Sequence, residues 1–189
     1  ANYGKPRHQP GTEVYSFYAG RCYHAIDPMP GAGGGGGSVW TRLGDRVTQS
    51  GLAERVVFAT IGVGSSEIDR WTVGGDLHVR LLETVAQLRA RGLSPTHLFW
   101  HQGEADQLTS GESYRAAFIR MIGDLRAIGI KAPVYVSVST YCNGQDSTEL
   151  QQAQRNLVDL GRKIYPGPDT DKLKIQEDRF DDCHFSGAG

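Results

Sequence analysis

The stretch THLFWHQGEAD, residues 96–106, joins a short apolar run to a dense cluster of polar side chains. Residues 97–100 have the length of a buried strand, and Gln102, Gly103 and Glu104 follow in a turn. Open α/β sheets build their sites where the strands end, at the carboxyl edge. Gly103 permits a tight backbone turn, Gln102 offers an amide donor, and Glu104 offers an acceptor. The stretch therefore predicts a functional loop at the edge of such a sheet.

Strands and helices are predicted to alternate along the rest of the chain. β-branched or alternating runs predict strands, and apolar residues at helical spacing predict helices. The expected strands are residues 13–18, 55–61, 97–100, 133–140 and 173–175, and the expected helices are residues 39–49, 76–90, 112–128 and 149–164. This alternation predicts one α/β domain with a mostly parallel sheet and helices on both faces.

The composition is that of an ordinary globular protein. The chain has 189 residues, 39% of them hydrophobic, and a net charge of −1. No basic stripe is present to bind nucleic acid or a membrane surface, and no apolar run approaches the length of a membrane span. The cellular location and the oligomeric state stay open.

The three cysteines, Cys22, Cys142 and Cys183, contain no CxxC pair, so a structural zinc site is not expected. One disulfide is possible, but the sequence does not fix a pairing. Cys142 and Cys183 are expected to be packing or bystander thiols rather than nucleophiles.

Three further polar clusters follow expected strands or lie near the end of the chain. Residues 62–66, GVGSS, contain glycines that let backbone N–H groups point at a ligand, and residues 139–141, STY, follow another strand. Near the end, the carboxylate of Asp181 can accept a hydrogen bond from Nδ1 of His184. That bond would fix the tautomer and leave Nε2 as a general base. With a hydroxyl nucleophile, the pair would complete a Ser-His-Asp site.

At these clusters the chain resembles the SGNH (GDSL-like) hydrolase superfamily, and within it the sialate O-acetylesterase and carbohydrate acetylesterase group. Residues 100–106 match the pattern Trp-x-Gln-Gly-Glu-x-Asp, and residues 62–71 match Gly-x-Gly-Ser-Ser-x-Ile followed by Trp. Residues 181–185 match the terminal Asp-x-x-His-Phe, and residues 37–43 also resemble the family. The Gln-Gly-Glu block together with a distant Asp-x-x-His is a fairly specific combination.

The resemblance implies a flavodoxin-like three-layer α/β/α sandwich, the SGNH hydrolase fold. It also implies a serine ester hydrolase that removes acetyl groups from a carbohydrate through an acyl-enzyme. In this scheme His184 is the general base and Asp181 orients it. The backbone N–H of Gly64 and the side chain of Gln102 would form the oxyanion hole.

The resemblance also suggests substrate contacts. Glu104 would brace the loop or touch the sugar, and Arg70 and Trp71 would line the substrate wall. No cofactor or metal is implied, and the expected partner is a small-molecule or carbohydrate ester.

The chain departs from the family pattern at the nucleophile. The Gly-x-Ser-Asn block of the family ends the first, central strand and usually precedes a segment like residues 1–4, ANYG. We therefore expect the serine and this strand to lie upstream of Ala1, and the last helix to be incomplete within residues 1–189. Without that serine, residues 1–189 should not hydrolyse esters.

Other assignments compete with these. Ser38 and Ser65 are alternative nucleophiles, but Ser38 suits a helix cap and Ser65 lies in the oxyanion loop. Asp182 is the alternative partner of the histidine. Gln102 could instead satisfy buried backbone groups, and Gly64 could be an ordinary turn glycine.

A metal site is a further alternative, built on His97, His101 and Glu104. It requires the strand to continue through both histidines, and Gly103 argues against this. The glycine-rich residues 31–37 lack the Gly-Lys-Ser/Thr of a phosphate loop and are expected to form a flexible loop.

Two other functions stay open. One is a lipid or aryl-ester hydrolase of the same superfamily, with the glycine-rich loop lining a longer apolar groove. The other is a non-catalytic carbohydrate-binding scaffold that keeps the fold but lacks the nucleophile.

Overall fold

The computed structural model describes all residues, Ala1–Gly189, as two compact units. The first unit combines Ala1–Gly64, Ala86–Gly92 and Ile175–Gly189, and the second combines Ser65–Val85 and Leu93–Lys174. Helix α2 (His78–Ala90) begins in the second unit and ends in the first. Each unit has its own three-stranded sheet, so the two are described in turn.

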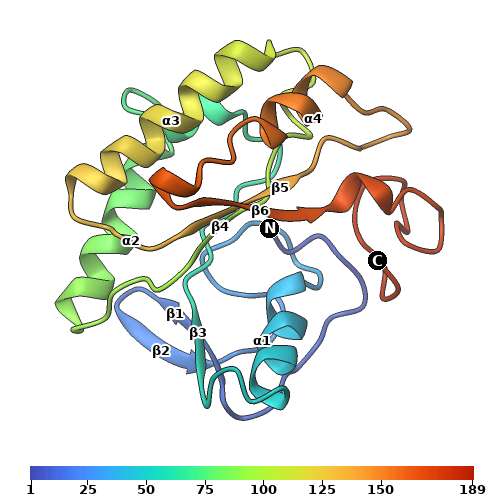
Figure 1. Cartoon of the computed structure of the whole chain (residues 1–189). Coiled ribbons are helices and arrows are strands. Elements are labelled where there is room, and N and C mark those ends of the chain that lie inside the picture. The colour runs from blue at the N-terminus through green and yellow to red at the C-terminus, as the bar shows by residue number, and fades with distance from the viewer. The chain divides into compact units, whose positions relative to one another are not determined.

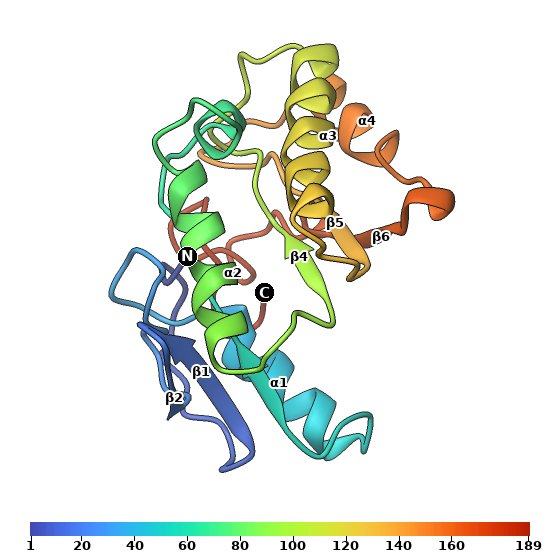
Figure 2. The same ribbon diagram turned by 90° about the vertical axis from the view of Figure 1, so that its left-hand side faces the viewer.

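The sheet of the first unit has the strand order β2-β1-β3. Strands β1 (Val14–Tyr18) and β2 (Arg21–His24) form an antiparallel hairpin, and β3 (Val56–Phe58) pairs with β1 in parallel. Figure 2 shows this hairpin in dark blue, the colour of the N-terminal residues. Helix α1 (Val39–Gln49) belongs to the same unit and has the bounds that the sequence predicted.

The sheet of the second unit is fully parallel, with the order β4-β5-β6. Its strands are β4 (Leu98–Trp100), β5 (Val134–Val138) and β6 (Ile164–Asp169). Helices α3 (Gly111–Ala127) and α4 (Thr148–Arg155) lie on the same side of β5 and β6 (Figure 1). The fold is mixed α/β with parallel strands, as predicted.

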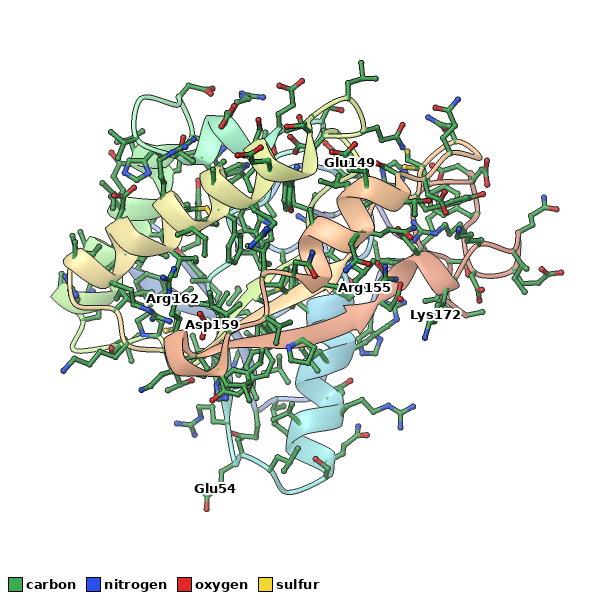
Figure 3. The ribbon with its side chains drawn as sticks, turned by 45° about the horizontal axis from the view of Figure 1, so that its top comes forward. Glu54, Glu149, Arg155, Asp159, Arg162 and Lys172 are labelled. Atoms are coloured by element: carbon green, nitrogen blue, oxygen red, sulfur yellow. The ribbon has the colours of Figure 1, made fainter.

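Short 3-10 helices complete the second unit: η1 (Ile68–Trp71), η2 (Leu160–Arg162) and η3 (Thr170–Lys172). Ion pairs flank β6, where Arg162 Nε lies 3.4 Å from Asp159 Oδ2 and Arg155 Nη2 lies 3.0 Å from Asp169 Oδ2. Figure 3 shows Asp159 and Arg162 near the start of β6 and Arg155 on α4. None of the helices is both long enough and apolar enough to span a bilayer.

Helix α3 forms because its local signals and its apolar spacing agree. The side chain of Ser110 accepts a hydrogen bond from Ser113 N and so caps the first turn. Tyr114, Phe118 and Met121 recur at helical spacing and are buried. The sequence predicted this helix within one residue at each end.

Only the first half of the helix predicted at residues 149–164 is present. Helix α4 ends at Arg155, and Ile164 begins β6 instead of closing a helix. The sequence missed this strand because its segment IYPGPD contains two prolines. Only β5 pairs with β6, so β6 is an edge strand, where proline is tolerated. The strand predicted at residues 173–175 is absent, and hairpin strand β2 was not predicted.

Residues 31–37 pack closely against the N-terminal segment, in contrast to the flexible loop that we expected. A Cβ on Gly34 would lie 2.4 Å from Asn2 O, and a Cβ on Gly36 would lie 2.4 Å from Gly4 O. Gly4 and Gly37 exchange two backbone hydrogen bonds, of 3.0 and 2.6 Å. The glycines therefore serve close backbone approach rather than mobility.

The cysteines differ from the expectation of packing thiols. Cys142 and Cys183 are disulfide-bonded, whereas Cys22 is free and exposed. A disulfide was possible from the sequence, but the spacing of the three cysteines did not indicate which residues would take part.

Candidate active site

The Asp181–His184 pair forms a compact loop within the first unit. His184 Nδ1 lies 2.8 Å from Asp181 Oδ2, and His184 N donates to Asp181 Oδ1 at 2.7 Å. Cys183 N also donates to Oδ1, at 3.2 Å. The contact expected from the sequence is therefore present. His184 Nε2 has no hydrogen-bond partner within the protein, so it is free to exchange a proton.

The environment of Asp181 keeps its carboxylate ionised. Partial burial opposes the charge, but hydrogen bonds from the backbone and ring of His184, the ring's charge and Cys183 N together outweigh it. The pKa of Asp181 therefore lies below its ordinary value of 3.8. An ionised acceptor at Nδ1 stabilises the tautomer whose Nε2 carries the free lone pair. The competing partner, Asp182, makes no such contact with the ring in this loop.

Arg179 holds the same loop from inside and was not anticipated from the sequence. Its side chain is only 1% exposed, and Nη1 donates to Cys183 O. The guanidinium carbon lies 4.6 Å from the centre of the Phe185 ring. Arg179 thus contacts the residues on both sides of His184, and it restricts the backbone that carries the imidazole.

Gly64 belongs to the first unit and has an available donor. Its backbone N–H makes no hydrogen bond within the protein. A Cβ on Gly64 would lie 2.6 Å from Tyr3 Oη, so only glycine allows this approach. The Tyr3 ring in turn packs on the His184 ring, with centroids 5.1 Å apart. Gly64, Tyr3 and His184 therefore form one continuous group of contacts.

Gln102 lies in the second unit and is fully hydrogen-bonded there. Its Nε2 donates to Ser66 O at 2.9 Å and to Asp106 Oδ2, while Oε1 accepts from the Tyr114 hydroxyl at 3.2 Å. Both amide hydrogens are thus committed. To serve an oxyanion, Gln102 has to exchange one of these bonds.

Asp106 is buried against Gln102. Ile68 N donates to Asp106 Oδ2 at 2.9 Å, and the Thr109 hydroxyl donates to Oδ1 at 2.9 Å. Burial raises the pKa of Asp106 above its ordinary value, although the hydrogen bonds from Gln102, Thr109 and Ile68 oppose this shift. Asp106 therefore anchors Gln102 at the cost of desolvating a carboxylate.

Glu104 braces the loop after β4, one of the two roles expected for it. Ser139 Oγ donates to Glu104 Oε1 at 2.8 Å. Gln154 joins the same loop, because its Nε2 donates to Gln102 O at 2.9 Å and its Oε1 accepts from Ser139 N at 3.0 Å. A Cβ on Gly103 would lie 2.1 Å from Ser139 O, so the tight turn requires glycine.

The expected substrate wall at Arg70 and Trp71 needs correction. Trp71 is only 3% exposed, its Nε1 donates to Ser66 Oγ at 3.1 Å, and its ring packs edge-on against Trp100. It is a core residue that presents no ring face to a sugar. Arg70 is partly exposed and pairs with Asp76 through two bonds of 2.9 and 2.7 Å, so its charge is already matched.

The residues considered for other roles have structural partners. His101 Nε2 lies 3.2 Å from Thr170 Oγ1, and His97 Nδ1 lies 3.0 Å from Thr96 Oγ1. Ser38 is buried at the N-cap of α1, but its hydroxyl donates to Asp27 Oδ1 at 2.8 Å and makes no cap bond. Ser38 is therefore a structural residue.

A second residue that the sequence did not indicate is Asp171, which is 3% exposed. Its carboxylate accepts hydrogen bonds from Thr140 N at 2.8 Å, the Thr140 hydroxyl at 2.6 Å, Tyr141 N at 2.9 Å and Gln151 Nε2 at 2.9 Å. Burial opposes the charge of Asp171, but these donors outweigh it and lower its pKa below 3.8. The cluster fixes the chain that follows β5.

Replacing Asp171 by asparagine should lower the free energy of unfolding by about 2–3 kcal/mol, because an amide cannot accept all four charge-assisted bonds. A carboxyl whose pKa is lowered on folding stabilises the native state above its unfolded pKa. The difference between wild type and Asp171→Asn should therefore be full at pH 7 and shrink as pH falls below 3.8. Urea unfolding of both proteins at pH 7 and below pH 3.8 measures this difference. Asp69→Asn, at an exposed carboxylate, is the control and should resemble wild type.

Comparisons with known proteins identify the family of the chain. The profile of the family described as carbohydrate esterase, sialic acid-specific acetylesterase, matches residues 38–189. A protein from Arabidopsis thaliana solved by X-ray crystallography is similar, with a TM-score of 0.78 and 20% identity over 95% of this chain and 76% of that one. A search of curated proteins gives no match.

The parallel α/β fold and the Asp-x-x-His loop define an SGNH-like protein. The profile match covers most of the sequence, so the chain belongs to the carbohydrate esterase, sialic acid-specific acetylesterase family. The likeness to the Arabidopsis structure shows that the fold is shared. The family points to a carbohydrate acetylesterase-like function.

Proposed function

We propose that the protein is a serine ester hydrolase that removes acetyl groups from a carbohydrate. The observation that carries the proposal is the Asp181–His184 pair, with Nδ1 held at 2.8 Å and Nε2 free. An imidazole held by a carboxylate and open on its other side suits a general base. Family membership supplies the ester class and the carbohydrate.

In the proposed reaction, His184 Nε2 takes the proton of a serine hydroxyl while the serine oxygen attacks the acetyl carbonyl carbon. The protonated imidazole then donates to the sugar oxygen as its bond to the acetyl carbon breaks. Water, deprotonated by the same nitrogen, then attacks the acyl-enzyme, and the imidazolium returns the proton to the serine oxygen as its bond to the acetyl carbon breaks and acetate leaves. Asp181 stabilises the imidazolium formed in each step and is not itself protonated.

By the resemblance, the serine belongs to the Gly-x-Ser-Asn block that precedes a segment like residues 1–4 in the family. Ala1 N lies 2.8 Å from the position that a Cβ on Gly62 would take. A residue joined to Ala1 therefore starts beside the loop that contains Gly64. This supports a serine that acts next to the free Gly64 N–H, which is the first donor to the developing oxyanion.

The test compares p-nitrophenyl acetate with p-nitrophenyl octanoate, using a full-length product that includes the residues preceding Ala1. Preference for acetate, together with acetate release from an O-acetylated sugar, supports the proposal. Preference for octanoate would favour the lipid-ester alternative instead. Absence of hydrolysis with retained sugar binding would replace the proposal by a non-catalytic scaffold.

A further inference from the structure

Tyr3 lies between the histidine and the glycine of the proposed site. Its ring centroid is 5.1 Å from that of His184, with the planes tilted by 40°. Its hydroxyl approaches Gly64 so closely that a Cβ there would lie 2.6 Å from Oη. The hydroxyl also lies 3.4 Å from the corresponding position on Gly33. The phenol thus spans from the imidazole to the loop that carries the free N–H.

The hydroxyl of Tyr3 is unused by the fold. It makes no hydrogen bond within the protein, and the side chain is 38% exposed. A tyrosine hydroxyl that is buried usually finds a hydrogen-bond partner. Here the hydroxyl is directed at a glycine whose own N–H is also unpaired. Two neighbouring donors without acceptors indicate a place for an acceptor that arrives with a ligand.

The backbone on both sides of Tyr3 is fixed. Asn2 is buried and exchanges side-chain hydrogen bonds with both backbone groups of Met29, at 2.7 and 2.9 Å. Gly4 N donates to Gly37 O at 3.0 Å, and Lys5 N donates to Phe185 O at 2.9 Å. The last bond ties the segment to the residue that follows His184. Tyr3 is therefore held in place before any substrate arrives, as electrostatic catalysis requires.

We propose that Tyr3 is an oxyanion-hole residue whose hydroxyl donates to the ester's carbonyl oxygen beside the N–H of Gly64. This assignment rests on the proposed function. A donor aimed at the charge that develops on the oxygen stabilises the transition state more than the ground state.

The test is Tyr3→Phe in the full-length protein, because phenylalanine keeps the ring that packs on His184 and removes only the hydroxyl. We expect kcat for p-nitrophenyl acetate to fall about 100-fold with little change in KM, as for other oxyanion donors. Tyr23→Phe is the matched control, since Tyr23 is an exposed tyrosine on β2 of the same unit, and it should keep full activity.

The outcomes separate this inference from the proposed function. If the wild type hydrolyses acetate and Tyr3→Phe keeps kcat within twofold, the oxyanion assignment is wrong while the esterase stands. A rise in KM with unchanged kcat would also overturn it, because that pattern indicates ground-state contact. Equal urea midpoints for wild type and Tyr3→Phe would show that a loss of kcat is not a loss of folding. An inactive wild type would refute the proposed function itself.

Discussion

His184→Ala in the full-length protein is expected to lower kcat/KM for p-nitrophenyl acetate by about 10⁴- to 10⁶-fold. The imidazole is the only group proposed to move the proton of the serine and of the leaving alcohol. Its Nε2 is free, and its Nδ1 is held at 2.8 Å by Asp181. Burst and steady-state kinetics on purified protein measure the effect.

His24→Ala is the control for that loss. His24 ends β2 on the exposed face of the same unit and packs only on the Tyr15 ring, 4.9 Å away. The His24→Ala variant should hydrolyse the ester at the wild-type rate. If His184→Ala retained more than a tenth of wild-type activity, another residue would be the base.

Asp181→Asn is expected to cost about 10⁴-fold in kcat with nearly unchanged KM. The amide can donate to Nδ1 and so favour the wrong tautomer, which places a proton on Nε2. The pKa of Asp181 lies below 3.8, so the wild-type carboxylate is ionised at neutral pH and loses its charge only as pH falls below that value.

The pH dependence checks this role. The carboxylate of Asp181 stays ionised from pH 5 to pH 8, so the loss of activity in Asp181→Asn should persist across this range. If asparagine supported near-normal turnover, the carboxylate would not be orienting the base. Asp182→Asn is the matched control at the neighbouring position.

Elements with strong local signals were predictable from the sequence. Helix α1 matches its predicted bounds, and α3 shifts by a single residue at each end because its cap and apolar spacing agree. Strand β6 was not predictable, because its prolines are acceptable only at a sheet edge, which tertiary pairing alone creates. The apolar spacing between residues 157 and 164 is also compatible with a helix, so the sequence favoured a helix there.

The candidate site also contains residues that the sequence predicted and residues that it did not. The Asp181–His184 contact spans three residues, so a local motif was enough to anticipate it. Tyr3 packs on the histidine from the far end of the chain, and the buried Arg179 contacts the residues on both sides of the histidine. No sequence pattern marks either residue. Trp71 shows the opposite error, since the resemblance implies that it lines the substrate wall, whereas the side chain is buried in the core.

The central claim is that His184 activates a serine upstream of Ala1, and active-site labelling tests it most directly. The full-length protein would be treated with a fluorophosphonate, digested and mapped by mass spectrometry. We predict one adduct, on a serine preceding Ala1, which is lost in His184→Ala and retained in His24→Ala. An adduct on Ser38 or Ser65, or labelling that survives the loss of His184, would contradict the account.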